Sequence, residues 1–474
     1  MDAIVQPETV VKKINCASKT TPCPKCGKRG KRKRRHNRKV RSIEYGKILI
    51  LDITYGEYTA KCSCCKSFSN APEGVKLRWR YDNKVREAVL NRILEDAMSV
   101  EGVIRAMERD FHLNLSSGFI YDCLRHEVGR LDMNEYRQFV LGKFSGVLCV
   151  DELHLGQYTL LLATDPLADL PVAFALVKKN DQDHMRRFLK NLKNWGFLPR
   201  VVVTDGSNLY PTVLAKLWPN AEHQLCVFHV IKDINEKILE EVRRLRRQLA
   251  NQGRKGRKRR RGRPRGGKRR QKLTNQKKAK FIFKHRFLIT MRRENLTKGQ
   301  RETLATMLAY LPALRTLREF TDRVHRLFEE KQSEHQAYCR RAALLREPAY
   351  QKHRGLVEAL AMLQDDVKFR KMIAFLRSPA SRRMRTNNHV ERTNRKLRYW
   401  EKVRYKWRRR RTLVRFLVLA LDRWGKAAKR REAAAAAAGG KQPKAGGQKT
   451  SRSKKRKSAE KKQDRDAKCR RKAA

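Results

Sequence analysis

Acidic residues are scarce in this chain, where 47 Asp and Glu stand against 114 Lys and Arg and the formal net charge is +67. Long hydrophobic runs are missing as well. No stretch approaches the roughly 18 uncharged apolar residues of a membrane-spanning helix, and the first residues lack the apolar centre of a signal peptide. We therefore expect no membrane partner and a cytoplasmic protein. The apolar fraction of 40% is below the usual roughly 45–50%, which favours a globular body with disordered polar segments.

Cysteine is also too sparse for a disulfide framework, because many of the 11 cysteines stand alone in the sequence. Scattered thiols of this kind are typical of a reducing compartment. The 474 residues suggest about three domains, at roughly 150 residues per domain.

The basic charge is unevenly distributed. Residues 251–280 carry 16 Lys and Arg and no acid, and residues 425–474 carry 19 against 4 acids. Residues 145–235 instead carry nine charges of each sign. Basic surfaces bind phosphate backbones through counterion release, whereas clustered carboxylates repel them unless a metal ion offsets the charge. This contrast predicts a nucleic-acid-binding protein with a metal-dependent site. The alternative is a binder without chemistry.

Two cysteine pairs lie near the N-terminus, Cys23 with Cys26 in CPKC and Cys62 with Cys65 in CSCC. Four thiolates at this spacing fit a tetrahedral zinc site. We therefore predict a zinc ribbon, in which Cys64 could replace Cys62 or Cys65. Buried free thiols are the alternative.

The sequence between the two pairs suggests how they meet. Residues 45–62 alternate in the manner of a β-hairpin that would bring the second pair to the first. The basic run 27–39 predicts a phosphate-binding loop, with a solvated linker as the alternative. Few large apolar side chains occur in residues 1–78, so zinc would take the place of a core.

A helical region follows. Residues 81–97 have helical periodicity, and in residues 99–111 Val103 and Met107 share one helical face with Val100 and Ile104. Ser116 or Ser117 can cap a third helix whose Ile120 and Leu124 point inward. Three short helices with a tight second turn predict a helix-turn-helix that reads the major groove of DNA. A small helical linker would give the same pattern.

The neutral segment predicts an α/β unit. GVLCVDELHLG, QYTLLLATD and PVAFALVKK form three strands, and a helix, the strand RVVVTDG, a second helix and the strand HQLCVFHV follow. If the first and fourth strands are neighbours, Asp151 and Asp205 lie side by side at the carboxyl edge of the sheet, where α/β sheets bind ligands.

Two adjacent carboxylates imply a divalent cation, Mg²⁺ or Mn²⁺, because both cannot stay ionised cheaply without one. Such ions activate the attacking oxygen and stabilise the leaving oxygen in phosphodiester chemistry. The alternative is that each Asp caps a helix or turn after its strand. We expect Glu152 to point to the opposite face of the sheet, and a turn to account for Asp165.

Three stretches carry a family resemblance: CVDELHLG, VVVTDGSNLYPTVLAKLWPNAEHQLCVFHVIKDI and TNNHVERTNRKLRYWEKVRYKWRRRR. They resemble the insertion-sequence DDE transposases, especially those with an N-terminal zinc ribbon and helix-turn-helix, and more distantly Mutator-like elements. The resemblance covers roughly residues 20–424. It implies an RNase H-like core in which Asp151, Asp205 and Glu391 bind the divalent ions.

The same resemblance bears on residues around these acids. Glu391 follows TNNH, where Asn387 or Asn388 can cap a helix; an ordinary glutamate at a helix start is the alternative, and Glu401 is the fallback. The family motif of Cys or Asp followed by His matches Cys226 and His229, which would organise the site or the DNA near it. A half-buried pair on the last strand is the alternative, and His223 would supply at most one further ligand to a zinc ion there. The residues expected to bind phosphates beside the metals are Arg392, Arg395 and Arg398.

The 185 residues between Asp205 and Glu391 fit a helical insertion of this family, with apolar spacing at Leu304, Met307, Leu308 and Leu311. Within it, Arg261, Arg263 and Arg265 surround an AT-hook-like core that would bind narrow A·T minor grooves. A disordered basic loop explains the same residues.

The sequence thus predicts an α/β protein with an RNase H-like mixed-sheet core and a large helical insertion, preceded by a zinc ribbon and a small helical DNA-binding domain. The expected segments are the ribbon (1–78), the helix-turn-helix region (79–140), the first part of the core (141–240), the basic and helical insertion (241–380), the final core helices (381–424) and a disordered basic tail (425–474).

The predicted activity is transposition, with metal-dependent cleavage at the element ends and strand transfer into target DNA. The expected cofactors are Mg²⁺ or Mn²⁺ and Zn²⁺. The expected partners are double-stranded DNA, as terminal repeats and as target, and further copies of the chain in a dimer or larger complex. An RNase H-like nuclease or resolvase without strand transfer, and a domesticated DNA-binding protein, are the alternatives.

Overall fold

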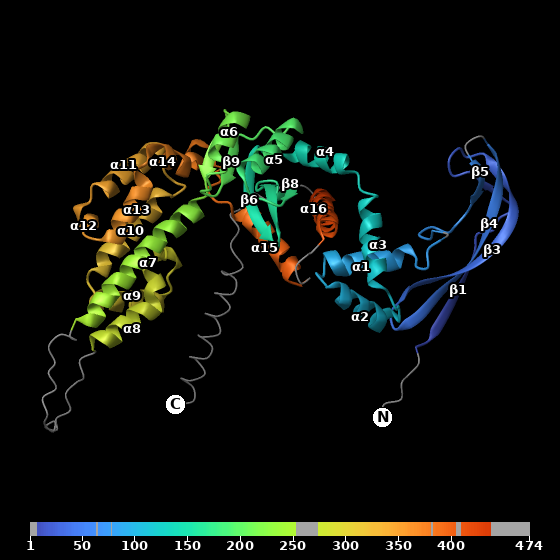
Figure 1. Cartoon of the computed structure of the whole chain (residues 1–474), viewed down its shortest axis with the longest axis horizontal. Coiled ribbons are helices and arrows are strands. Elements are labelled where there is room, and N and C mark those ends of the chain that lie inside the picture. The colour runs from blue at the N-terminus through green and yellow to red at the C-terminus, as the bar shows by residue number, and fades with distance from the viewer. Residues whose placement is uncertain are drawn as a thin grey trace, which may run out of the picture.

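The computed structural model describes residues 7–62, 65–76, 78–252, 274–380, 383–403 and 409–437. The molecule is elongated: a β-sheet built from the first strands lies at one end, a bundle of helices at the other, and a mixed sheet between them (Figure 1). Within these described residues, no helix has both the length and the apolarity of a membrane span.

The N-terminal sheet is built on one long hairpin. Its strands are β1 (Thr9–Asn15), β2 (Thr20–Pro22), β3 (Arg29–Glu44), β4 (Lys47–Cys62) and β5 (Cys65–Ser69), in the order β1-β4-β3-β2 with β5 also paired to β4. Gly46 makes the β3–β4 turn, and its φ of 72° is one that glycine adopts without strain.

Two expectations for this region were wrong. The hairpin arms are β3 and β4, so the hairpin is longer than residues 45–62, and most of the basic run 27–39 is in strand β3 and not in a loop. The backbone of β3 pairs with β4, while β2 covers β3 only from Arg29 to Lys31. The remaining outer edge carries exposed Lys and Arg side chains, which discourage pairing with other chains.

Three short helices follow, α1 (Asn83–Leu94), α2 (Val100–Phe111) and α3 (Ser117–Val128). Ser116 caps α3 as predicted, by accepting the backbone N–H of Phe119. The predicted inward residues Val103, Met107, Ile120 and Leu124 are all buried. Their core is completed by Phe416 and Leu419 from the last helix, α16 (Arg410–Ala437).

The central sheet has five strands at the predicted places, but the last predicted strand, 223–230, ends at Leu225, and helix α7 (Val227–Asn251) follows it. The strands are β6 (Val147–Leu155), β7 (Tyr158–Asp165), β8 (Leu170–Val177), β9 (Val201–Thr204) and β10 (Glu222–Leu225), in the order β10-β9-β6-β7-β8. β6, β9 and β10 are parallel, and β7 is antiparallel to both of its neighbours. The first and fourth of these strands, β6 and β9, are neighbours as expected.

Helices cover both faces of this sheet. On one face pack α4 (Met133–Lys143), α5 (Gln182–Asn194) and α6 (Pro211–Leu217), and the core there includes Met185 and Phe188 of α5. On the other face pack α15 (Asn388–Val403) and α16, through Val390, Leu397 and Leu413 among others.

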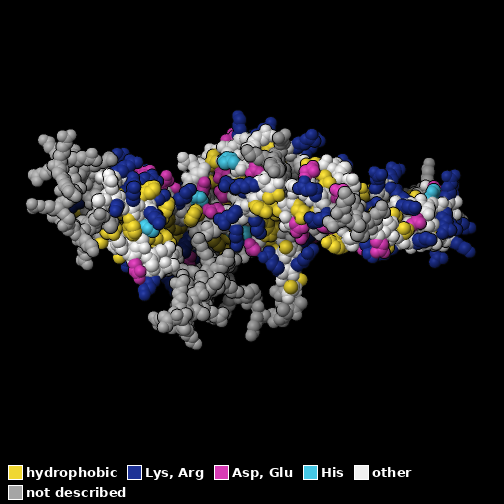
Figure 2. Space-filling model, turned by 90° about the horizontal axis from the view of Figure 1, so that it is seen from below, with side chains coloured by type: hydrophobic (Ala, Val, Ile, Leu, Met, Phe, Trp, Pro, Cys, Tyr) yellow, Lys and Arg dark blue, Asp and Glu magenta, His cyan; other side chains and the backbone are white. Residues whose placement is uncertain are grey.

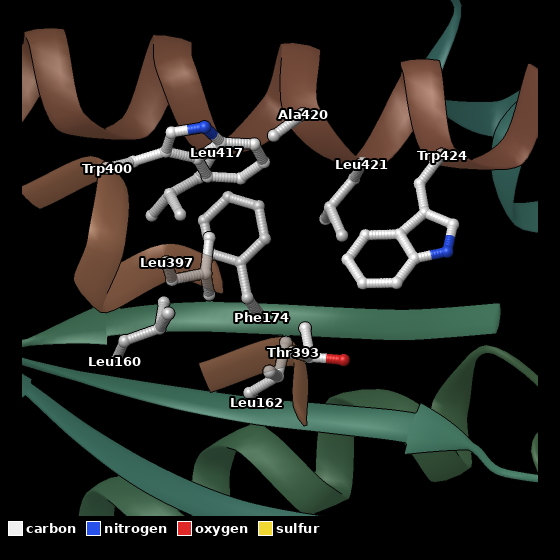
Figure 3. Close-up of a pocket in the computed structure, with 10 residues that line it drawn as sticks. All are labelled: Leu160, Leu162, Phe174, Thr393, Leu397, Trp400, Leu417, Ala420, Leu421 and Trp424. Atoms are coloured by element: carbon white, nitrogen blue, oxygen red, sulfur yellow. The ribbon is translucent and has the colours of Figure 1, made fainter. Parts of the chain in front are cut away.

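A small pocket lies between the sheet and the two helices of this second face (Figure 3). Leucines of β7, Phe174 of β8, Trp400 of α15 and Trp424 of α16 line it, and Thr393 is the one polar side chain of the lining. Because no titratable group lines it, this pocket is not a candidate for catalysis.

The helical bundle lies between β10 and α15 in the sequence and has a core of its own. Its helices are α7 (Val227–Asn251), α8 (Asn275–His285), α9 (Lys298–Tyr310), α10 (Leu314–Leu327), α11 (Glu334–Leu345), α12 (Pro348–Gln351), α13 (Arg354–Gln364) and α14 (Asp366–Met372), with 3-10 turns at Arg286–Ile289, Arg293–Asn295 and Ala374–Arg377. Of the predicted apolar positions, Leu304 and Met307 are buried and Leu308 and Leu311 partly so. Helix α13 packs so closely on α7 that a Cβ on Gly355 would lie 2.5 Å from the carbonyl oxygen of Lys237.

The end of the chain differs from the expectation of a disordered tail after residue 424. Helix α16 continues to Ala437, because its end has contacts with the core. Gly425 lies against the ring of Tyr136, and Arg431 pairs with Asp169 at 3.1 Å. Residues 438–474, and the insertion loop with Arg261, Arg263 and Arg265, lie outside the described residues.

Candidate functional site

Asp151 lies within β6, which continues to Leu155 instead of ending at the aspartate, because β7 pairs with it up to Tyr158. Its neighbours Cys149 and Leu153 belong to the core under α15. Since side chains alternate along a strand, Asp151 faces the same helix. The Asn394 side chain of α15 donates a hydrogen bond of 2.7 Å from Nδ2 to Oδ2 of Asp151.

Asp205 follows β9 directly. The parallel register pairs Cys149 with Val203, so two residues further along each strand Asp151 and Asp205 reach the same level. Asp205 also accepts the backbone N–H of Ser207 at 2.9 Å, so it caps the turn as well. The structure thus brings these two predicted acids together at the carboxyl edge of the sheet.

Glu152 joins them. Carboxylate oxygens of Asp151, Glu152 and Asp205 lie within 4.8 Å of one another. Glu152 does lie on the other side of the strand, beside Tyr210 of the core that α5 and α6 form. The predicted face is therefore right, but the longer side chain of Glu152 still brings its carboxylate to the two aspartates at the sheet edge, which we had not expected.

The electrostatics of this acid cluster favour a bound cation. Burial, followed by the charges of Glu152 and Asp205, raises the pKa of the Asp151 carboxyl to about 7, although the Asn394 hydrogen bond opposes the shift. Burial also raises the pKa of Glu152. Oδ1 of Asn394 is buried and has no hydrogen-bond partner among the described residues, while the hydroxyl of Tyr210 faces the Glu152 carboxylate. Buried oxygen acceptors of this kind fit a hard divalent ion such as Mg²⁺.

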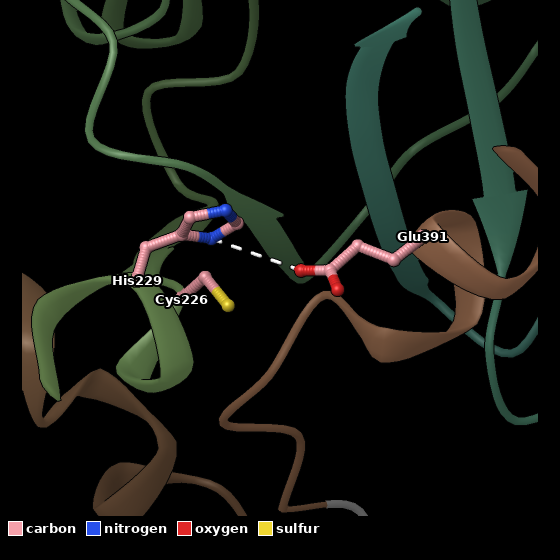
Figure 4. A group of neighbouring side chains, drawn as sticks. All are labelled: Cys226, His229 and Glu391. Carbon is pink, nitrogen blue, oxygen red and sulfur yellow. Dashed lines mark ion pairs between the residues drawn. The ribbon is translucent and has the colours of Figure 1, made fainter. Parts of the chain in front are cut away.

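Glu391 is in the first turn of α15 and belongs to a different group. Its carboxylate lies within 4.8 Å of ligand atoms of Cys226 and His229, and its Oε1 is 3.8 Å from Nδ1 of His229. All three side chains point into the space between the start of α7 and the start of α15 (Figure 4). Among the described residues, Glu391 is not part of the group that contains Asp151 and Asp205.

Cys226 and His229 are not on the last strand, as one alternative had it. β10 ends at Leu225, Cys226 precedes α7, and His229 is in its first turn. Burial raises the pKa of the Cys226 thiol, while backbone N–H groups, that of Asn387 first among them, oppose the shift. His223 stays apart and forms a hydrogen bond of 2.9 Å between its Nε2 and the Thr204 hydroxyl.

Asn387, the residue before α15, forms hydrogen bonds to Cys226 and to the strand of Asp151. Its backbone N–H donates to Sγ of Cys226 at 3.2 Å, and its Nδ2 donates to the carbonyl oxygen of Val150 at 3.0 Å. Its Oδ1 has no hydrogen-bond partner among the described residues, so the side chain does not cap α15 as we had expected for Asn387. Asn387 instead connects the strand of Asp151 to the start of α7.

The other predicted residues have simpler settings. Arg392 is half-exposed and lies 3.5 Å from Asp169, and Arg395 and Arg398 are exposed. Glu401, the fallback acid, lies beside Gly156 at the β6–β7 turn, away from the acid cluster. Asp165 accepts hydrogen bonds from the backbone of Ser145, Leu167 and Ala168, so the turn accounts for it as expected.

The N-terminal cysteines are partly described. Sγ of Cys23 lies 3.1 Å from Sγ of Cys65, and Cys26 is exposed nearby in sequence. The side chain of Cys62, and all of Cys64, lie outside the described residues. Lys and Arg side chains are spread along the molecule and are dense over this N-terminal sheet (Figure 2).

Sequence reasoning missed Asn394 and Tyr210, and it gave Asn387 and Glu152 other roles. One signal could have found Asn394: it follows Glu391 by three residues, and such positions share one face of a helix. Nothing in the local sequence could have found Asn387, whose contacts are to residues more than 150 positions away.

Comparison with known proteins bears on this geometry. No curated protein matches the chain. The sequence model of the ISL3-type DDE family, described as a transposase, matches residues 148–415. This match covers more than half of the chain and spans the central sheet, the helical bundle and α15, and therefore includes both side-chain groups. The chain belongs to this family of DDE transposases.

Proposed function

We propose that this transposase cleaves DNA at the ends of its mobile element and transfers the freed strand to target DNA at the edge formed by Asp151 and Asp205. Glu391 would be the third acid, and Mg²⁺ or Mn²⁺ the bound ion. The observation that carries this assignment is the pair of carboxylates at matching positions of neighbouring parallel strands, with a third carboxylate beside them.

The residues present fit such ions. The donors of the cluster are all oxygens, and the neighbouring Oδ1 of Asn394 is buried with no hydrogen-bond partner among the described residues. When bound, divalent ions would activate the attacking oxygen and stabilise the leaving oxygen. The amide of Asn394 would hold Asp151 in one orientation.

Glu391 would reach this edge from its position on α15. It lies one turn before Asn394, on the same face of α15, and Asn394 touches Asp151. Glu152 is the rival for the third position, since its carboxylate is already beside the two aspartates. Replacing each glutamate separately decides between them.

The arrangement of elements supports an RNase H-like core. Three strands joined by turns, then two parallel strands added to the first, with helices on both faces, are the expected pattern. The bundle of α7 to α14 would be the family's insertion, although α7 begins before residue 241, where the sequence had suggested the boundary. Two further boundaries move, because α4 crosses residue 140 and packs on the central sheet and α16 runs past residue 424 to Ala437. The boundaries at residues 78 and 381 stay as proposed.

The N-terminal parts would bind the terminal repeats. The close approach of Cys23 and Cys65 supports a zinc ribbon with Cys26 and Cys62 as the other ligands. Helices α1 to α3 would form the helix-turn-helix. Assembly of a dimer or larger complex would bring two element ends together.

The test uses the DNA that flanks the gene as substrate. Wild type, Asp205→Asn and the control Asp183→Asn, an exposed aspartate of α5, are incubated with that DNA and Mg²⁺. Cleavage and joining by wild type and control, and neither by Asp205→Asn, is the expected result. Cleavage without joining would favour a nuclease, and equal activity of all three proteins would contradict the assigned site.

A further inference from the structure

We propose that Cys226, His229 and Glu391 form a second metal site, selective for a soft divalent cation such as Zn²⁺. The three residues contribute a sulfur, an imidazole nitrogen and a carboxylate oxygen, all within 4.8 Å of one another. This is the mixed donor set that zinc binds with three protein ligands and one water. Mg²⁺, which prefers oxygen ligands, has no comparable reason to bind there.

The spacing of the ligand atoms suits one ion. Two ligands of a tetrahedral zinc ion lie about 3.3 Å apart when each bond is about 2 Å long. Nδ1 of His229 and Oε1 of Glu391 are 3.8 Å apart, so a small side-chain rotation closes the difference. Both atoms are buried and have no hydrogen-bond partner within the part of the chain that the structure describes. The two atoms form an ion pair with each other at 3.8 Å, and a bound cation would take the place of that contact.

Burial raises the pKa of the Cys226 thiol, and two features of its surroundings oppose that shift. Cys226 is fully buried, and its Sγ accepts the backbone N–H of Asn387 at 3.2 Å. Hydrogen bonds to sulfur stabilise the thiolate, which is the form that binds metals. The sulfur also lies at the start of α7, where unpaired backbone N–H groups favour negative charge.

An ion could enter the site. The side chains of His229 and Glu391 are 31% and 25% exposed, and the neighbouring Phe228 is half-exposed. Parts of these side chains therefore reach solvent, although the ligand atoms Nδ1 and Oε1 are themselves buried. A water molecule could complete the coordination.

One consequence depends on the function proposed above. If Glu391 also holds the catalytic ion, the two sites share one carboxylate, and zinc on Cys226 and His229 would keep Glu391 away from Asp151 and Asp205. Zinc would then compete with Mg²⁺ for assembly of the active site. The zinc site itself does not require this, so binding can be tested apart from activity.

The test counts zinc per full-length chain, after equilibration with a slight excess of ZnCl₂ and removal of loose metal. Wild type is compared with Cys226→Ser and with His229→Asn. Each variant should bind one zinc ion per chain fewer than wild type. Zinc bound by the N-terminal cysteines does not affect this result, because it contributes equally to wild type and variant. Unchanged zinc content in both variants would overturn the proposal.

Cys339→Ser is the matched control. Cys339 lies 3.4 Å from His335 on the exposed surface of α11, so it is a Cys–His pair without a carboxylate in the group. This variant should keep the wild-type zinc content. Loss of the same zinc ion in it would assign the metal to the surface pair and overturn the proposal.

Two further variants separate this proposal from the catalytic assignment. Asp151→Asn should retain the zinc, since its carboxylate is outside the group, whereas Glu391→Gln should weaken zinc binding at least about tenfold, as expected when one ligand is lost. If Asp205→Asn retained full cleavage, the catalytic assignment would fail while the zinc count stayed valid. If Glu391→Gln bound zinc with the affinity of wild type, Glu391 would be excluded as a zinc ligand, and the proposed three-residue site would be overturned.

Discussion

Two groups of metal-ligating side chains lie near the start of α15, and they differ in chemistry and in origin. The acid cluster offers only oxygens, and its members come from one edge of the central sheet. The group of Cys226, His229 and Glu391 offers sulfur, nitrogen and oxygen, and its members come from the starts of two helices. Strand register alone assembles the first group, whereas the second depends on how distant segments pack. The first suits a hard ion and the second a soft one.

The largest effect should come from Asp151→Asn. Loss of this charge should lower DNA cleavage at least ~1000-fold, corresponding to about 4 kcal/mol of transition-state stabilisation, if the residue binds the catalytic ion. Affinity for DNA should stay nearly unchanged in a gel-shift assay.

The same variant offers a readout in the absence of metal. Because the folded-state pKa of Asp151 is raised to about 7, well above the ordinary value of about 3.9, the ionised carboxylate destabilises the folded protein at pH 8. Asp151→Asn should therefore raise the melting temperature in EDTA at pH 8. A lower melting temperature would indicate a structural role for this aspartate.

The choice of third acid should give the next largest difference. Glu391→Gln should lose cleavage to nearly the same extent as Asp151→Asn, whereas Glu152→Gln should lose about 10-fold, as expected for a residue that supports a metal ligand. Single-turnover cleavage at saturating Mg²⁺ measures both. The reverse order would make Glu152 the third acid and leave Glu391 to the soft site alone.

Asn394→Ala should have a moderate effect. It removes the donor to Asp151, and loss of such a contact to a metal ligand typically costs about 10–100-fold in metal affinity or activity. The Mg²⁺ concentration for half-maximal cleavage should rise, and high Mg²⁺ should restore part of the rate. Asn394→Asp, which places a charge beside Asp151, should not restore the loss at low Mg²⁺. Wild-type dependence on Mg²⁺ in Asn394→Ala would contradict the positioning role.

The smallest effect concerns His223, which belongs to neither group and forms a hydrogen bond with the Thr204 hydroxyl. Burial lowers the pKa of His223 to about 4, below its ordinary value of about 6.5. Between about pH 4 and about pH 6.5 the unfolded chain therefore binds more protons at this residue than the folded chain does. The free energy of unfolding should fall by about 1–3 kcal/mol as the pH drops through this range.

Urea denaturation at several pH values measures this slope. His223→Gln should flatten it and should leave the zinc content unchanged. An altered zinc content would bring His223 into the soft group, and an unchanged slope would show that another residue causes the pH dependence.

The predictable part of this molecule followed from local patterns. The hydrophobic runs before Asp151 and Asp205 indicated neighbouring strands, and the apolar spacing of α5 matched its buried face. The predictions for two segments were wrong, because contacts with residues distant in the sequence determine their secondary structure. Strand β3 is extended in spite of its charge because it pairs with β4, and α16 continues past Trp424 because Gly425 and Arg431 contact the core.

The candidate site also depends on contacts that local sequence patterns do not reveal. Glu391 was found through family resemblance, because a single glutamate at a helix start carries no chemical signature. The contact that sets its position, from Asn387 to Cys226, joins residues far apart in the sequence. The reach of Glu152 depends on side-chain length at a sheet edge, which the two-residue alternation of a strand does not capture.

Helix α16 has a consequence for the way the chain is made. The core of α1 to α3 includes Phe416 and Leu419, which leave the ribosome only after the central sheet and the bundle. Until α16 has been synthesised, the apolar face of these three helices is therefore exposed to solvent, and such a surface is prone to aggregation or chaperone binding. A fragment that ends before residue 410 would keep that face exposed, so the core of α1 to α3 should be completed only after the residues of α16 have been synthesised.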